Sequence, residues 1–352
     1  MAARASRSRP DSDSVPRKGA ARSTVGGDEE SVIEAAPGAR RKLWRWVMLA
    51  LRILIPLVIL GYLLMVVPLR DTLASLKAIP PWAFAAGLAI GLSGILVSGW
   101  RWQLLFAACG IRERPSVLTL FGLHLVALFY NSFLPGGVGG EVVRGVATRH
   151  IMGSRGLSGA LAIVLLERTL GTAGLMILVA STFALFPLGD FGNVVLWSGI
   201  GLCGAALAVA CITNGVRMAR FLPAPLAKVV AGLPTIEAHK PFAAALALSV
   251  VTQSAVIFLG HVLLSSITSV RFTDSMVVMP LIGASGYFPL TVGGAGIREY
   301  AFVKLYGVVG VAEHDALAAS LAYAAIIYTA AGIGGIVHAL SPLTIERSSG
   351  LS

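Results

Sequence analysis

The chain has 352 residues, of which 56% are hydrophobic and only 13% are charged, about half the charged share of a typical soluble domain. Its net charge of +11 does not indicate nucleic-acid binding, because Lys and Arg are concentrated in the N-terminal region and in short loops between apolar runs, a distribution typical of membrane proteins. Composition therefore argues against a soluble enzyme and predicts an integral membrane protein with several transmembrane helices.

The N-terminal region, residues 1–42, is polar, basic and without apolar periodicity. Such a segment buries too little surface to fold alone, so we expect a disordered tail. It is too long and too charged for a cleaved signal peptide. We place this tail in the cytoplasm, followed by a transmembrane domain over 43–345 and a short cytoplasmic tail over 346–352.

The transmembrane domain is predicted from apolar runs that are near or above the about 20 residues needed for a helix to cross a bilayer. In chain order these runs are 46–67, 81–100, 116–134, 157–186, 193–213, 241–270, 275–291 and 316–340. We therefore expect an all-α, polytopic transmembrane bundle in the cell membrane.

The Lys and Arg content of the loops predicts the orientation of these runs, because cytoplasmic loops are enriched in basic residues. We place the loops 101–114 and 214–240 and the segment 144–155 in the cytoplasm with the N-terminus. Loops 187–192 and 268–274 then lie outside.

This orientation leaves 116–134 and 157–186 both starting on the cytoplasmic side. Between them the chain has to enter the membrane and return, either as a full span with a return or as a re-entrant hairpin turning at 135–140. The same problem arises from the other side at 275–309, where the turn is 289–296. We expect a proline- and glycine-broken hairpin at each place.

The two turns resemble each other in sequence. Each has an apolar run, a proline, a Gly-Gly-x-Gly cluster and a short segment with one Arg and one Glu, and each is followed by a long apolar run. The orientation places the two units in opposite directions, which predicts an inverted repeat of the kind found in transporters.

Broken helices at membrane depth favour a binding site, because their free backbone groups are tolerated only when packed in protein or lining a wet cavity. The positive end of a helix that starts after each break, together with a nearby arginine, suits a phosphate. The residues that we predict to contact the substrate are Asn131, Pro135, Gly136, Gly137, Gly139, Gly140, Glu141, Arg144, Glu167, Arg168, Gly293, Gly294, Gly296, Arg298 and Glu299.

Several of these residues have structural interpretations that the sequence leaves open. The glycines can serve helix packing alone. Glu167 and Arg168 interrupt an apolar run and, being adjacent, should reach different partners; Glu167 either acts on the substrate or neutralises Arg144 or Arg298. Glu141 can pair locally with Arg144, and Asn131 can orient the turn instead of contacting a ligand.

Other polar and aromatic residues receive structural roles. We expect His124, His261 and His338 to be satisfied by neighbouring helices, and the tryptophans to anchor span ends at the membrane interface. The cysteines Cys109, Cys203 and Cys211 have no metal-type spacing and read as small buried apolar residues. We find no catalytic motif, nucleotide-binding loop or metal cluster, and predict no cofactor and no enzymatic activity.

Over about 43–345 the sequence resembles the family that forms the transmembrane region of lysylphosphatidylglycerol synthases, grouped as flippase-like integral membrane proteins. The resemblance rests on Asn131 with 134–140 and Arg144, the Glu167–Arg168 pair, and 293–299. It implies the flippase-like half alone, since no synthase domain accompanies it here.

The resemblance and the residues together predict a transporter of an anionic or aminoacylated phospholipid or a polyprenyl-phosphate lipid. The phosphate would lie between Arg144 and Arg298, with the acidic residues favouring a partly cationic headgroup. The alternatives are a membrane-embedded transferase acting on a lipid phosphate and a non-transporting scaffold for envelope assembly. The sequence leaves the lipid, the direction, the energy source, and homo-oligomerisation or an envelope-biosynthesis partner open.

Overall fold

The computed structural model describes residues 37–133, 139–185, 235–285 and 294–340, and within these ranges every regular element is a helix. The prediction of an all-α protein is therefore confirmed. The predicted run 193–213, most of the predicted N-terminal tail and the short C-terminal tail lie outside the described residues. By its internal contacts the chain divides into two units, one that ends at Trp44 and one that starts at Arg45 and contains the helical fold.

The first helix, α1 (Pro37–Val66), covers most of the first predicted run and is followed by α2 (Leu69–Ala78). The two helices meet at an angle of 96°, with Pro68 at the start of α2, where its fixed φ is compatible with a helix start. The helix α2 was not predicted, because its charged residues interrupt any apolar run. Leu63 at the end of α1 packs in a core cluster with Phe302 and Tyr306.

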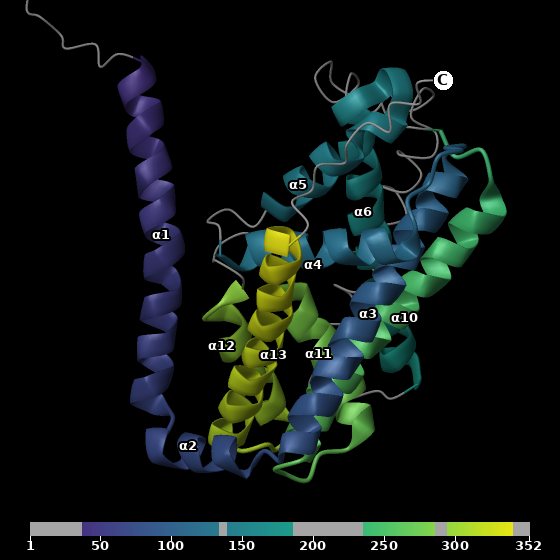
Figure 1. Cartoon of the computed structure of the whole chain (residues 1–352). Coiled ribbons are helices and arrows are strands. Elements are labelled where there is room, and N and C mark those ends of the chain that lie inside the picture. Colours follow the sequence, from purple (N-terminus) through teal and green to yellow (C-terminus); the bar gives the residue numbers. More distant parts are fainter. Residues whose placement is uncertain (1–36, 134–138, 186–234, 286–293, 341–352) are drawn as a thin grey trace, which may run out of the picture. The chain divides into compact units, whose positions relative to one another are not determined.

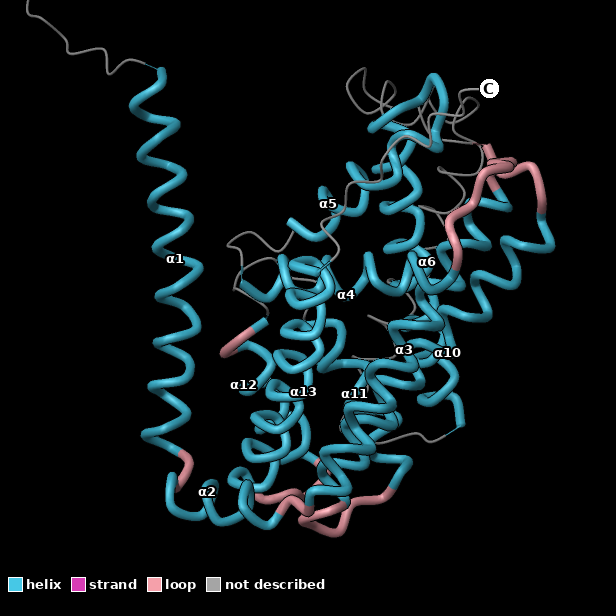
Figure 2. The backbone as a smooth tube through the Cα atoms, in the orientation of Figure 1, coloured by secondary structure: helices cyan, strands magenta, loops and turns pink. Residues whose placement is uncertain are grey.

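The helices α3 (Pro81–Ala108) and α10 (His239–Ser265) run side by side in opposite directions (Figures 1 and 2). The end of α3 is fixed to the start of α10, because the Glu237 N–H donates to the Ala108 carbonyl at 2.8 Å. Small residues allow the close approach: a Cβ placed on Gly94 would lie 3.4 Å from the Ala255 Cβ.

The end predicted for the second span was wrong, since α3 extends through Ala108 instead of stopping at residue 100. Arg101 was placed in a cytoplasmic loop but lies inside the helix and is buried. A buried arginine is tolerated when a carboxylate compensates its charge. Here that carboxylate belongs to Glu167, which is far along the chain and is not considered when basic residues in loops are counted.

The middle of the chain forms α4 (Val117–Phe133), α5 (Gly139–Thr148), the short 3-10 helix η1 (Arg149–Arg155) and α6 (Gly156–Leu185). The segment 144–155, placed on the cytoplasmic side by its basic residues, is helical almost throughout. After the break at residues 134–138, which lie outside the described residues, α5 packs against both α4 and α6.

The last third of the chain has two short helices followed by a long one, as the middle of the chain does. These helices are α11 (Phe272–Ser285), α12 (Ile297–Val308) and α13 (Glu313–Leu340), and they follow the same sequence of lengths as α4, α5 and α6. The inverted orientation of the two units and their re-entry into the membrane remain predictions.

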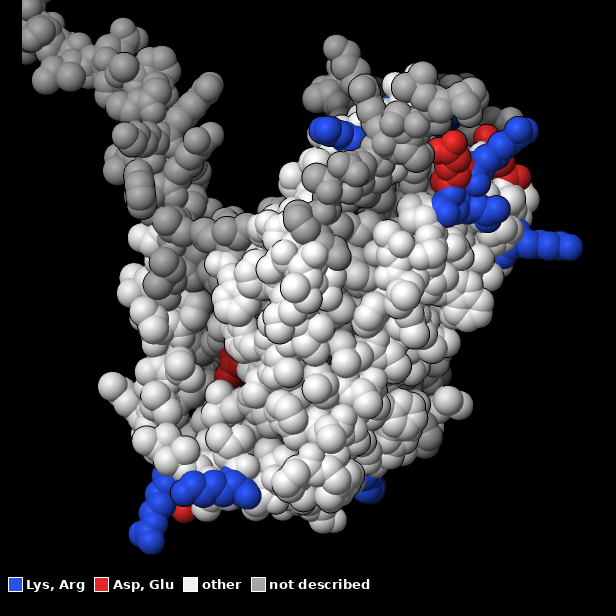
Figure 3. Space-filling model, in the orientation of Figure 1, with Lys and Arg blue, Asp and Glu red and all other residues white. Residues whose placement is uncertain are grey.

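Four helices in the described part of the chain are long and apolar enough to cross a membrane, or five if α1 and α2 count as one bent span. On the face drawn in Figure 3, most of the described surface is uncharged, and the Lys, Arg, Asp and Glu side chains lie mainly toward two ends, apart from one recessed acidic patch near the middle. Such a surface suits a hydrocarbon environment with polar boundaries.

Candidate functional site

A cluster of ionic side chains lies buried where α3, α4, α5 and α6 meet. Glu167 of α6 is its centre: Oε1 accepts hydrogen bonds from Arg101 Nη2 at 2.7 Å and lies 3.1 Å from His124 Nε2, and Oε2 pairs with Arg144. Glu167 is only 2% exposed. A charge at this depth is stable only when it is paired and hydrogen-bonded, as this carboxylate is.

The cluster carries more positive than negative charge. Arg101 and Arg144 share the single carboxylate of Glu167, and Arg101 donates its remaining Nη1 bonds to the neutral hydroxyls of Ser249 at 3.3 Å and Thr252 at 3.4 Å. With His124 neutral, these four ionisable residues have one positive charge in excess. A buried cation excess attracts an anion into the cluster.

Trp102 forms one wall of the cluster. It is fully buried, with the Arg144 guanidinium 4.5 Å from the centre of its ring and the His124 imidazole edge-on at 5.3 Å. A cation over an indole face is stabilised by the ring quadrupole. The prediction that Trp102 anchors a span end was therefore wrong, whereas Trp82 and Trp100 are exposed.

A second ion pair joins α5 to α6 beside the cluster. Glu141 of α5 pairs with Arg168 of α6, and Arg144 of α5 pairs with Glu167 of α6. The prediction that Glu167 and Arg168 reach different partners is confirmed. The alternative of a local Glu141–Arg144 pair was wrong, because each side chain finds its partner on α6.

Asn131 holds the α4–α5 hairpin together. Its Oδ1 accepts a hydrogen bond from the Gly140 N–H at 2.8 Å, and its Nδ2 donates to Glu141 Oε1 at 3.3 Å. This arrangement gives Asn131 the turn-orienting role that the sequence left open. Gly139 begins α5 and Gly140 follows it, whereas Pro135, Gly136 and Gly137 lie outside the described residues.

Gly140 is required by the close approach of α5 to α4. A Cβ at this position would clash with the Ala127 carbonyl oxygen and lie 2.8 Å from Asn131 Nδ2. We expect Gly140→Ala to destabilise the protein by about 1–3 kcal/mol, the typical effect of forcing an extra group into a packed interior. Thermal unfolding in detergent measures this change.

The matched control is Gly122→Ala in α4, whose added Cβ would come no closer than 3.8 Å to Val337. We expect that substitution to be neutral or stabilising by up to about 1 kcal/mol, because alanine is the better helix former. Equal melting temperatures for the two variants would contradict the close packing of the hairpin.

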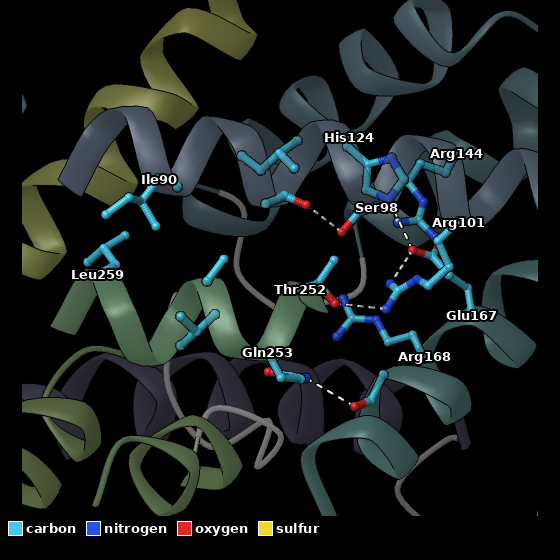
Figure 4. A pocket seen from close by; sticks show the side chains of 16 residues that line it. Ile90, Ser98, Arg101, His124, Arg144, Glu167, Arg168, Thr252, Gln253 and Leu259 are labelled. Atoms are coloured by element: carbon cyan, nitrogen blue, oxygen red, sulfur yellow. Dashed lines mark hydrogen bonds and ion pairs between the residues drawn. The ribbon is translucent and has the colours of Figure 1, made fainter. Parts of the chain in front are cut away.

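The ionic cluster forms one end of a half-open cavity of about 300 Å³ lined by residues of α3, α4, α5, α6 and α10 (Figure 4). Its polar end is lined by Arg101, His124, Arg144, Glu167, Arg168, Thr252 and Gln253. The other end is apolar and is lined by Ile90, Gly91, Ile95, Ala255, Val256 and Leu259. Figure 4 shows Ile90 and Leu259 on the side away from the arginines. The cavity thus has a charged end and an apolar end.

The second turn lies in a different environment. Glu299 Oε2 accepts the Gly296 N–H at 2.5 Å and caps α12, while its Oε1 accepts bonds from Arg298 at 2.6 and 3.1 Å. Gly296 has φ = +81°, which favours glycine, and its backbone lies against Pro56 of α1. Arg298 lies 5.9 Å from the Tyr323 ring.

Arg298, Glu299, Gly294 and Gly296 are not among the described residues that line the cavity of Figure 4, and Gly293 lies outside the described residues. The structure brings Arg144, Glu167 and Arg168 together at this cavity, but it does not place Arg298 with them. A phosphate shared by the two turns therefore stays a prediction.

Five polar residues of the cavity were not predicted from the sequence, namely Ser98, Arg101, His124, Thr252 and Gln253. Arg101 was discarded as a loop residue and His124 as a satisfied core histidine. The available signal was that an arginine and a histidine lie within otherwise apolar runs and that ionisable residues inside spans are functional candidates.

His261, His338 and Cys109 have structural roles, as predicted. His261 Nδ1 lies 3.0 Å from Ser275 Oγ, and His338 Nε2 lies 3.1 Å from the Tyr130 hydroxyl. Cys109 is a buried free thiol, whereas Cys203 and Cys211 lie outside the described residues. Within the described ranges, no group of His, Cys, Asp and Glu is arranged to hold a metal ion.

The helices define a polytopic membrane protein whose half-open cavity has a charged end and an apolar end. Residues 47–335 match the family described as the lysylphosphatidylglycerol synthase TM region. The match covers most of the chain, so the protein belongs to this family of membrane proteins linked to lipid handling. No curated protein matches the chain.

Proposed function

We propose that this protein binds the anionic headgroup of a membrane lipid at the Arg101–Arg144–Glu167 cluster and moves that lipid across the membrane. The observation that carries the proposal is the cavity itself, which has a buried excess of positive charge at one end and an apolar wall at the other. An amphipathic lipid with a negative headgroup has the same division of polarity.

Unused donors in the cluster support a phosphate headgroup. The Nε atoms of Arg101 and Arg144 are buried and have no hydrogen-bond partner among the described residues. An unsatisfied buried donor costs about 1–3 kcal/mol, and more when it is charged. A phosphate offers several strong acceptor oxygens, and guanidinium groups bind it with short, charge-assisted hydrogen bonds.

The charge balance of the cluster supports an anionic headgroup. Both oxygens of Glu167 lie within hydrogen-bond distance of Arg101, His124 and Arg144, so this carboxylate is already compensated. Glu141 pairs with Arg168 through Oε1, whereas its buried Oε2 has no hydrogen-bond partner among the described residues. A phosphate with a cationic substituent therefore stays a prediction beside a plain anionic lipid.

The apolar end supports a lipid over a soluble phosphate as the ligand. Ile90, Val256 and Leu259 continue the cavity away from the charges along α3 and α10. Apolar burial contributes about 25 cal/mol per Å², so acyl or polyprenyl carbon in this part of the cavity would add affinity that inorganic phosphate lacks.

A transport assay tests the proposal. Purified protein is reconstituted into liposomes that contain fluorescent phosphatidylglycerol, and a membrane-impermeant quencher reports the lipid in the outer leaflet. We expect the quenched fraction to rise from about half toward completeness, and fluorescent phosphatidylcholine to move more slowly. Movement equal to that in protein-free liposomes would overturn the proposal, and a chemically altered lipid in the same samples would favour a transferase.

A further inference from the structure

His124 stands between a donor and an acceptor that it cannot satisfy together. Its Nδ1 lies 2.9 Å from the Leu120 carbonyl and therefore carries the proton that it donates there. Its Nε2 lies 3.0 Å from Arg144 Nη1 and 3.1 Å from Glu167 Oε1. A neutral Nε2 accepts from the arginine but has no proton for the carboxylate, and a protonated Nε2 has the opposite preference.

We propose that His124 binds a proton together with the anionic headgroup, so that lipid movement is coupled to protons. The inference rests on the proposed function, because the second ligand is the lipid phosphate. On protonation, Nε2–H donates to Glu167 and no longer accepts from Arg144, which frees that Arg144 donor for a phosphate oxygen. The charge excess of the cluster rises at the same time from one to two.

The surroundings of His124 favour this coupling. The charged groups facing it are Arg144 on α5 and Glu167 on α6, with Arg101 on α3 joined to it through Glu167. Trp102 of α3 faces His124 with its uncharged ring. The helix α13 also packs against α4, but its His338 is bonded to Tyr130 and does not face His124. His124 lines the cavity, so a proton and a phosphate enter by the same route.

Reciprocity makes the inference measurable. If a bound anion favours the protonated imidazole, the proton must favour the anion by the same factor. The affinity for an anionic lipid therefore rises as the pH falls, by up to about tenfold per pH unit where one proton is taken up per lipid. The lipid should keep the same charge over this pH range, so that any proton taken up belongs to the protein.

The experiment is isothermal titration calorimetry of the full chain in detergent with dihexanoyl phosphatidylglycerol, whose phosphodiester lacks the second ionisation of a phosphate monoester near pH 6. Titrations from pH 5 to 8, in phosphate-free buffers of different ionisation enthalpy, give the affinity and the number of protons taken up. We expect uptake approaching one proton per lipid and affinity that weakens with rising pH.

His124→Gln assigns the proton, and His338→Gln is the matched control because it removes a histidine that is bonded to Tyr130. We expect the His124→Gln variant, at whatever affinity it binds, to take up no proton, and the control to behave as the natural protein. Uptake retained by His124→Gln would give the proton to another group and overturn the inference.

The natural protein decides the matter even if His124→Gln does not fold. Lipid binding with constant affinity and no proton uptake would overturn proton coupling while leaving the proposed function in place. Absence of lipid binding at every pH would overturn both. These two results are distinguishable in the same titration.

Discussion

Replacing Glu167 by alanine is expected to destabilise the protein by about 3–5 kcal/mol, the usual cost of removing one partner from a buried ion pair. The substitution leaves the guanidinium groups of Arg101 and Arg144 buried together without a carboxylate. They would repel each other, because no other carboxylate pairs with them among the described residues. Thermal unfolding in detergent, followed by helical circular dichroism, measures the loss.

Glu313→Ala is the matched control for this experiment. Glu313 pairs with Lys304 at 3.2 Å, but the two side chains are 41% and 40% exposed, and a pair in contact with water contributes only about 0–1 kcal/mol. Similar melting temperatures for the two variants would mean that Glu167 is hydrated and does not stabilise a buried cluster.

Arg144→Gln is expected to lower lipid movement by about a hundredfold, because losing one buried charged partner costs about 2–5 kcal/mol and each 1.4 kcal/mol is tenfold. Glutamine keeps a polar side chain near Glu167 but removes the charge and the paired donors for phosphate. The liposome assay with fluorescent phosphatidylglycerol measures the rate, and insertion of the variant into the membrane is checked separately.

Arg298→Gln is the informative comparison, because Arg298 is also a buried arginine near the start of a short helix and is also paired with a glutamate. Arg298 does not line the cavity, so we expect less than a tenfold effect on the rate. A loss as large as that of Arg144→Gln would instead support one headgroup shared by the two turns.

The helical fold could be predicted from the apolar runs of the sequence, and so could the pairing of Glu167 and Arg168 with different partners. Each of these features depends on a local pattern. Long apolar runs predict helices in a bilayer whatever their neighbours are. Adjacent residues on a helix necessarily face different directions. The family could be predicted as well, since it depends on motifs within one continuous region.

The composition of the cavity could not be predicted in the same way. Arg101, His124, Arg144 and Glu167 come from four different helices, and only tertiary packing shows that they meet. Counting basic residues placed Arg101 in a loop, because that method has no knowledge of a compensating carboxylate far along the chain. Trp102 was misread for the same reason, since its partners belong to α4 and α5.

The most direct test of the central claim is native mass spectrometry of the protein in mild detergent, with the Arg101→Gln/Arg144→Gln double variant beside it. Our account predicts that the natural protein retains an anionic phospholipid or polyprenyl phosphate and that the double variant loses it. Equal retention of the same lipid by both proteins, or retention of a zwitterionic lipid alone, would contradict the role of this cluster in headgroup binding.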